Sequence, residues 1–139
     1  MDWKACAVDD LRKYNYIKIG IANSTEKLRC IEAQAEHGKL NSGKYSSSPD
    51  SRLINALVES ERLRNNILLS KNLAKMIERG LDALSDDERY VLREFYMQEA
   101  DVNMIKLKER LGYEMRSVYR LRDRALEKFT LAMYGVQNL

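Results

Sequence analysis

The sequence predicts an all-α protein, and three observations lead to this fold class. The 139 residues include a single proline, so little interrupts helices. The β-branched residues do not cluster into the alternating runs that strands require. Apolar residues instead recur at steps of three and four along most of the chain, which is the period of an amphipathic helix. The hydrophobic content of 45% is enough for the core of one domain or two small ones.

Residues 1–37 are predicted to be an N-terminal helical segment. Its first apolar positions share one helix face: Trp3, Ala7, Leu11 and Tyr14. The run Asn23-Ser24-Thr25-Glu26 offers a second helix cap, and it precedes another apolar face: Leu28, Ile31 and Ala35. His37-Gly38 is expected to end that helix. We interpret the aromatic residues Trp3, Tyr14 and Tyr16 as core residues, with a partner-binding patch as the alternative.

Residues 38–48 are rich in glycine and serine and predict a flexible linker. Residues 49–80 then predict one long central helix, because Ser48-Pro49 is a good helix start and Gly80 a plausible stop or kink. An unbroken a/d register supports this helix: Leu53, Ala56, Ser60, Leu63, Ile67, Ser70, Ala74, Ile77, Leu81 and Leu84. The seam of this register has two candidate partners, the N-terminal segment in a helical hairpin or a second copy of the chain in a coiled coil.

Residues 81–139 predict three helices joined by short turns. Ser85-Asp86-Asp87-Glu88 forms a capping box, which starts a helix from about Asp86 to Met97. Asp101 or Asn103 can cap a short second helix that carries Met104, Ile105, Leu107 and Leu111 and ends at Gly112. The third helix places these apolar residues on one face: Val118, Leu121, Ala125, Phe129 and Ala132. A short glycine-containing turn between the last two helices is typical of a helix-turn-helix.

Positive charge collects on these last two helices. Residues 103–128 hold eight basic and four acidic side chains, a net charge of +4, whereas the whole chain carries +3. Arg116, Arg120 and Arg124 fall opposite the apolar face of the third helix. A basic surplus confined to one exposed face suggests a surface for double-stranded DNA, with a merely solvated face as the alternative.

Position along the third helix divides the candidate DNA contacts into two classes. Asp123 and Glu127 come later on the arginine side and are poorly tolerated beside phosphates, so residues 115–120 are expected to enter the groove. The base-contacting candidates are Arg116, Ser117 and Arg120, because arginine donates two bonds to a guanine edge and discriminates by roughly 1–3 kcal/mol. The phosphate-contacting candidates are Lys106, Tyr119, Arg124 and Lys128.

The same segment resembles region four of bacterial sigma factors. The resemblance rests on four segments, Leu84–Leu92, Leu107–Tyr113, Ser117–Leu121 and Arg124–Lys128, and the module that contains them covers about 50 of the 139 residues. It implies a helix-turn-helix that reads promoter minus-35 DNA and touches RNA polymerase. The whole chain, with a helical N-terminal half before this module, is similar in length and pattern to phage late-gene transcriptional regulators of the ArpU and RinA type. The implied function is activation of phage or prophage late transcription.

Residues for catalysis or metal binding are too few to predict an enzyme or a cofactor. Cys6, Cys30 and His37 cannot supply the four ligands of a structural zinc site. No run approaches the ~20 apolar residues of a membrane span, and the N-terminus lacks a signal-peptide core, so we expect a cytoplasmic, nucleoid-associated protein in a bacterial cell. Two alternative functions stay open, a phage terminase small subunit that binds a packaging site and an adaptor that binds RNA polymerase through the same module.

Overall fold

The computed structural model describes residues 1–36 and 49–135, and every regular element within these ranges is helical. The elements are α1 (Trp3–Glu36), α2 (Pro49–Asp82), α3 (Asp86–Leu92), the π-helical turn η2 (Arg93–Met97), α4 (Met104–Leu111) and α5 (Met115–Tyr134). The predicted all-α fold class is therefore confirmed. The predicted linker, residues 38–48, lies outside the described residues.

The helices form two compact units. Unit 1 consists of residues 1–16 and 73–139, and unit 2 of residues 17–72. Both long helices pass from one unit into the other. The domain boundaries predicted from the sequence fall at the ends of helices. The boundaries between the compact units instead fall inside α1, after residue 16, and inside α2, after residue 72.

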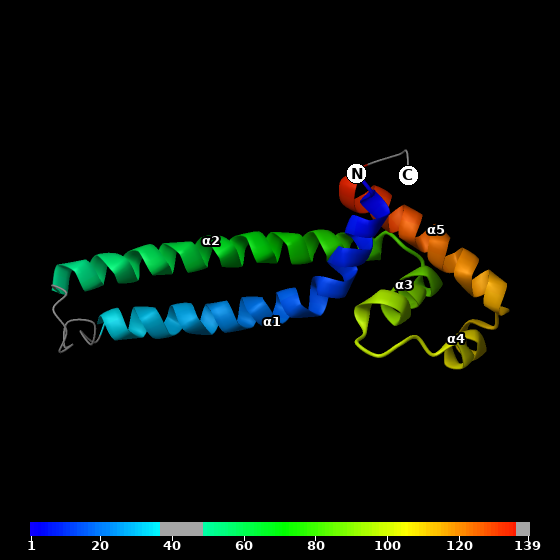
Figure 1. The fold of residues 1–139 in the computed structure, drawn as a ribbon, viewed down its shortest axis with the longest axis horizontal. Helices are drawn as coiled ribbons and strands as arrows, with labels where there is room; N and C mark the ends of the chain where they lie inside the picture. The colour runs from blue at the N-terminus through cyan, green and yellow to red at the C-terminus, as the bar shows by residue number, and fades with distance from the viewer. Residues whose placement is uncertain (37–48, 136–139) are drawn as a thin grey trace. The chain divides into compact units, whose positions relative to one another are not determined.

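Unit 2 is an antiparallel pair of helices, formed by residues 17–36 of α1 and residues 49–72 of α2 (Figure 1). Ion pairs link the two helices, with Lys27 Nζ 3.6 Å from Glu59 Oε1 and the Arg64 guanidinium bound to Glu32. Of the predicted seam residues of α2 in this unit, Ser60, Leu63 and Ile67 are buried, whereas Leu53 is 43% exposed. The seam from Ser60 to Ile67 is therefore covered within the chain, and pairing of two copies stays a prediction.

Helix α1 continues through the region where the sequence suggested a second helix start. The expected cap at residues 23–26 is wrong, because these residues lie inside one helix of 34 residues. Thr25 donates a hydrogen bond from Oγ1 to the carbonyl of Ile21 at 2.7 Å, so its hydroxyl is satisfied within the helix. Ala35, expected on a buried face, is exposed.

The core of unit 1 brings the start of the chain against its C-terminal helix. Ala7 and Leu11 of α1 are fully buried. The rings of Trp3 and Tyr134 lie 5.0 Å apart, and the Tyr134 hydroxyl donates to Asp10. The largest fully buried side chains include these: Phe129, Leu11, Ile77, Leu92 and Leu107. The prediction that Trp3 and Tyr14 face the core is consistent with their half-buried positions, whereas Tyr16 is exposed.

Gly80 allows a close approach between α2 and α5. A Cβ atom at this position would lie 2.8 Å from Cε2 of Phe129 and 3.0 Å from Cδ2 of the same ring. The helix continues beyond Gly80 to Asp82, so the prediction of a helix stop is wrong. The glycine is needed because the ring of a buried phenylalanine occupies the space that any side chain would fill.

Helix α3 begins with the predicted capping box. The amide of Glu88 donates to Ser85 Oγ at 3.3 Å, and the amide of Ser85 donates to Glu88 Oε1 at 3.0 Å, so the prediction is confirmed. The helix was expected to run to about Met97, and the backbone is helical to that residue. Its last part, residues 93–97, is wound as the π-helical turn η2, and nothing in the apolar pattern indicated that change.

Candidate nucleic-acid interface

Helices α4 and α5 are joined by a turn at Gly112, Tyr113 and Glu114, and α3 and α4 both lie against α5 (Figure 1). Asn103 caps α4, since its Oδ1 accepts a hydrogen bond from the amide of Lys106 at 3.2 Å. Gly112 ends α4 in the left-handed conformation with φ of 70°, and its amide donates to the carbonyl of Lys108 at 2.8 Å. The chain therefore reverses sharply here, where glycine avoids the strain that a side chain would cause.

The first turn of α5 begins without a side-chain cap in the part of the chain that the structure describes. Glu114 has the extended backbone of a cap residue, with φ of −74° and ψ of 161°. Within the described residues, its side chain makes no capping hydrogen bond. The amide donors and the positive end of the helix dipole are thus left for another partner, and an anion is the preferred one.

Helix α5 buries one face and exposes the other, as its periodicity predicted. Val118, Leu121, Ala125 and Phe129 are buried, but Ala132 is exposed, so that part of the prediction is wrong. The inner face is wider than predicted because three further residues of α5 are buried: Leu126, Thr130 and Met133. Neighbours on α1, α2 and α3 therefore surround the C-terminal half of α5.

The candidate base-contacting residues lie together on the exposed face. Arg116, Ser117 and Arg120 are all exposed, and steps of one and four residues place them on adjacent positions of the first two turns of α5. Lys106 on α4 and Arg124 on α5 are exposed as well. The fold thus leaves these five polar side chains accessible from solvent.

Tyr119 is held by its neighbours and is 37% exposed. Its ring centroid lies 6.0 Å from that of Phe95, and the Arg122 guanidinium lies 5.0 Å from the centroid of the Tyr119 ring. Arg122 also lies over Phe95, 5.1 Å from its ring centroid. Helical spacing does not predict this stack, because Phe95 belongs to η2 and Arg122 to α5. Packing therefore limits the directions in which the Tyr119 hydroxyl can point.

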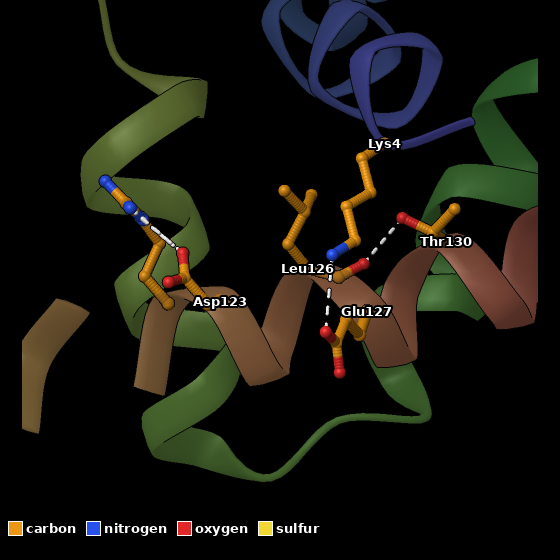
Figure 2. A network of polar contacts seen from close by, with 6 residues as sticks. Lys4, Asp123, Leu126, Glu127 and Thr130 are labelled. Atoms are coloured by element: carbon orange, nitrogen blue, oxygen red, sulfur yellow. Dashed lines mark hydrogen bonds and ion pairs between the residues drawn. The ribbon is translucent and has the colours of Figure 1, made fainter. Parts of the chain in front are cut away.

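The two carboxylates expected to repel phosphates are paired with cations (Figure 2). Asp123 Oδ1 accepts a hydrogen bond from Arg122 Nη2 at 2.9 Å, and Glu127 Oε1 lies 3.3 Å from Lys4 Nζ. Figure 2 also shows Thr130, whose hydroxyl donates to the carbonyl of Leu126 at 2.6 Å. The ion pairs reduce the negative potential beside the arginine face, although both acids lie at the surface, where screening keeps such effects small.

Lys128 forms an ion pair with a buried carboxylate. Its Nζ lies 2.9 Å from Glu88 Oε2, and the side chains are 59% and 8% exposed, respectively. Burial acts to raise the pKa of Glu88, but hydrogen bonds from Lys128 and Ser85 outweigh it and lower the pKa below the ordinary value. Lys128 therefore stabilises the fold, and its role as a phosphate contact stays a prediction.

Three exposed apolar residues flank the candidate base contacts. Ile105 is 73% exposed, Met115 is 48% exposed and Tyr113 is 40% exposed. The sequence prediction for α4 places Ile105 with the apolar residues of the helix and does not separate it from Leu107, which is buried. Helical spacing could have done so, because Ile105 is out of phase with Met104, Leu107 and Leu111. Apolar side chains at this place suit contact with thymine methyl groups or with a protein surface.

The described residues hold no constellation for metal chemistry. In residues 1–36 and 49–135, no three side chains among His, Cys, Asp and Glu are placed to hold one ion. In the same ranges, no helix combines the length and apolar character needed to cross a membrane. What the structure presents is an exposed basic helix face beside a glycine turn. No family model, curated protein or solved structure matches the chain.

Proposed function

We propose that the chain is a sequence-specific DNA-binding transcriptional regulator whose α4, turn and α5 act as a helix-turn-helix resembling sigma region four. The observation that carries the proposal is the exposure of Arg116, Ser117 and Arg120 on the first two turns of α5, directly after the turn. The regulator is proposed to be of the phage late-gene activator type, in which the long helix α2 precedes the DNA-binding module.

In this proposal the N-terminal turns of α5 enter the major groove. The guanidinium groups of Arg116 and Arg120 each donate two hydrogen bonds to a guanine edge, and Ser117 contacts a neighbouring base. The backbone amides after Glu114, left without a side-chain cap among the described residues, favour a phosphate at the same end of the helix. Base recognition and backbone attachment are thus supported by one helix terminus.

Phosphate contacts flank the groove-entering turns. Lys106 and Arg124 supply exposed cations on either side of the turn, and Tyr119 supplies a hydroxyl whose ring is fixed by packing. Lys128 would have to share its ammonium between a phosphate and Glu88. We therefore expect Lys106 and Arg124 to contribute more to DNA affinity than Lys128. RNA polymerase and a second copy of the chain remain proposed partners.

Arg116→Ala and Arg120→Ala are expected to weaken binding to the preferred DNA sequence. Each loses a bidentate base contact, which corresponds to roughly 1–3 kcal/mol, or about 5- to 150-fold in affinity. The preferred sequence is first selected from a random DNA pool, and affinities are then measured by fluorescence anisotropy at fixed salt.

Lys71→Ala is the matched control, because it removes one positive charge from an exposed position in unit 2. If both arginine variants bind every DNA as tightly as the unchanged protein, the DNA-binding proposal is wrong. Retention of RNA polymerase by these variants would then favour the adaptor. A large ring in sedimentation, together with binding to a packaging site, would favour the terminase subunit.

Lys106→Ala is expected to flatten the salt dependence of DNA binding. Each neutralised phosphate releases counterions, so losing one contact lowers the slope of log affinity against log salt by about one. The loss of affinity is expected to be similar for preferred and random DNA, since phosphate contacts carry no direct sequence information. An unchanged slope in a salt titration would show that Lys106 does not contact a phosphate. This result would not bear on Arg116 and Arg120, which have their own test.

A further inference from the structure

A cavity of about 270 Å³ lies where α3, η2 and α4 meet. Its lining consists of Asp86, Arg89, Tyr90, Arg93 and Arg110. Three guanidinium groups and one carboxylate give these side chains a formal charge of +2. None of these residues is among the candidate DNA contacts, so the cavity is a separate feature of unit 1.

Helix geometry brings these side chains together. Asp86, Tyr90 and Arg93 recur at steps of four and three along α3 and η2, and Arg89 lies between them on the same face. Val91 and Leu92 of α3 are fully buried in the core, which fixes the orientation of that helix. The cavity therefore has one wall that is firmly anchored.

Arg110 supplies the opposite wall from α4. Its Cζ lies 4.1 Å from the centroid of the Tyr90 ring, the distance of a cation–π contact. Such a contact orients the guanidinium plane and leaves its N–H groups directed outward from their edges. Arg110 is thus held over Tyr90 with donors still available to a ligand.

Arg89 is also fixed in place. Its Nε donates to the carbonyl of Leu81 at 3.2 Å and its Nη2 to the carbonyl of Leu84 at 3.0 Å. The same Nη2 lies 3.5 Å from Asp86, whose side chain is 98% exposed. A carboxylate so exposed offsets little of the positive potential inside the cavity, because solvent screens it.

The hydroxyl of Tyr90 does not open into the cavity. Its oxygen is buried and has no hydrogen-bond partner among the described residues. The ring of Tyr90, rather than its hydroxyl, therefore serves the cavity, because it supports the Arg110 guanidinium.

We propose that this cavity binds a phosphate group. Phosphate oxygens match the planar donors of arginine, and the three arginines that line this cavity can surround one phosphate. The volume leaves room for a second linked phosphate or a sugar. The phosphate has two candidate sources, a free phosphorylated small molecule and the backbone of a nucleic acid.

The test uses the full chain and inorganic pyrophosphate as the probe. Calorimetric titration is expected to show saturable binding that weakens at least tenfold in Arg110→Gln and in Arg93→Gln and stays unchanged in Tyr90→Phe. Tyr90→Phe keeps the ring beneath Arg110 and removes only the buried hydroxyl. The circular dichroism spectrum and the melting temperature of each variant verify that it is folded.

Arg62→Gln is the matched control, since it removes one exposed guanidinium from unit 2. The second arm measures the salt slope of DNA binding for Arg93→Gln and Arg110→Gln. Saturable pyrophosphate binding with an unchanged slope identifies a free phosphorylated ligand, whereas a slope lowered by about one per variant identifies the nucleic-acid backbone.

The proposal is overturned if folded Arg93→Gln and Arg110→Gln match the unchanged protein in both arms, or if Arg62→Gln loses as much pyrophosphate affinity as they do. The proposed DNA function is judged by Arg116 and Arg120, which are not in the cavity. If DNA binding fails altogether, the pyrophosphate arm still decides whether the cavity binds phosphate.

Discussion

Gly80→Val is expected to lower the free energy of unfolding by about 3 kcal/mol or more, because an added side chain would overlap the ring of Phe129. The nearest ring atom lies 2.8 Å from an ideal Cβ, and Phe129 is fully buried. Close packing means that the ring cannot move without displacing its own neighbours. Gly80→Ala should cost less, about 1–2 kcal/mol, since alanine regains about 1 kcal/mol of helix propensity. Urea unfolding followed by far-UV circular dichroism measures both.

Gly20 provides a matched control within another long helix. Nothing lies within 4 Å of a Cβ built at Gly20, so Gly20→Ala is expected to stabilise the protein by roughly 0.5–1 kcal/mol. A Gly80→Ala/Phe129→Leu double variant replaces the ring with a smaller side chain. Its loss in the free energy of unfolding should be smaller than the sum of the losses in the two single variants. Stabilisation by Gly80→Ala equal to that of Gly20→Ala would show that the contact with Phe129 carries no strain.

Lys128→Glu is expected to destabilise the protein by about 2–3 kcal/mol at neutral pH, because it replaces the ion pair to Glu88 with two facing carboxylates. The loss stays below the ~3–5 kcal/mol of a fully buried pair, since Lys128 is 59% exposed and solvent screens it. Arg62→Glu, a reversal in the surface pair of Arg62 with Glu59, should cost clearly less, because solvent screens both side chains. Equal losses in the two variants would contradict a special role for burial at Glu88.

The contribution of Glu88 to the free energy of unfolding should change with pH in opposite directions in the unchanged protein and in Lys128→Glu. In the unchanged protein the pKa of Glu88 is lowered on folding, so its stabilisation is present above the unfolded pKa of about 4.3 and is lost as the pH falls through the folded pKa. In Lys128→Glu, burial and the second carboxylate raise the pKa, so protonation relieves the repulsion as the pH falls from neutrality. Unfolding curves measured at successively lower pH should therefore show a smaller difference in the free energy of unfolding between the unchanged protein and Lys128→Glu.

Periodicity predicted the helices and most of the inner face of α5, because burial of one helix face follows from spacing alone. Val118, Leu121 and Ala125 are buried as expected. The same spacing could not predict the approach of Phe129 to Gly80, since that contact joins positions far apart in the sequence. It also missed the continuity of α1 past Thr25, where the hydroxyl bonds inside the helix instead of starting a new one.

In the candidate site, too, local features could be predicted from the sequence, whereas contacts between elements could not. The exposure of Arg116 and Arg120 followed from their phase on α5, which is local information. The partners that modify the site come from elsewhere in the chain: Lys4 binds Glu127, and Glu88 binds Lys128. The arginine cavity depends on the packing of Arg110 over Tyr90, which no single helix pattern contains. Contacts between elements, rather than the elements themselves, were therefore the part that sequence reasoning could not supply.

The pairing of α1 with α5 in unit 1 sets an order of events during synthesis. Tyr134 bonds to Asp10 across 124 positions, and Lys4 reaches Glu127 across 123. Contacts of such separation form slowly, because a long loop must close first. Both helix segments of unit 2 have been synthesised once residue 72 is in place, whereas the first 16 residues must wait for α5 before their contacts with it can form. The nascent chain thus completes its basic module last.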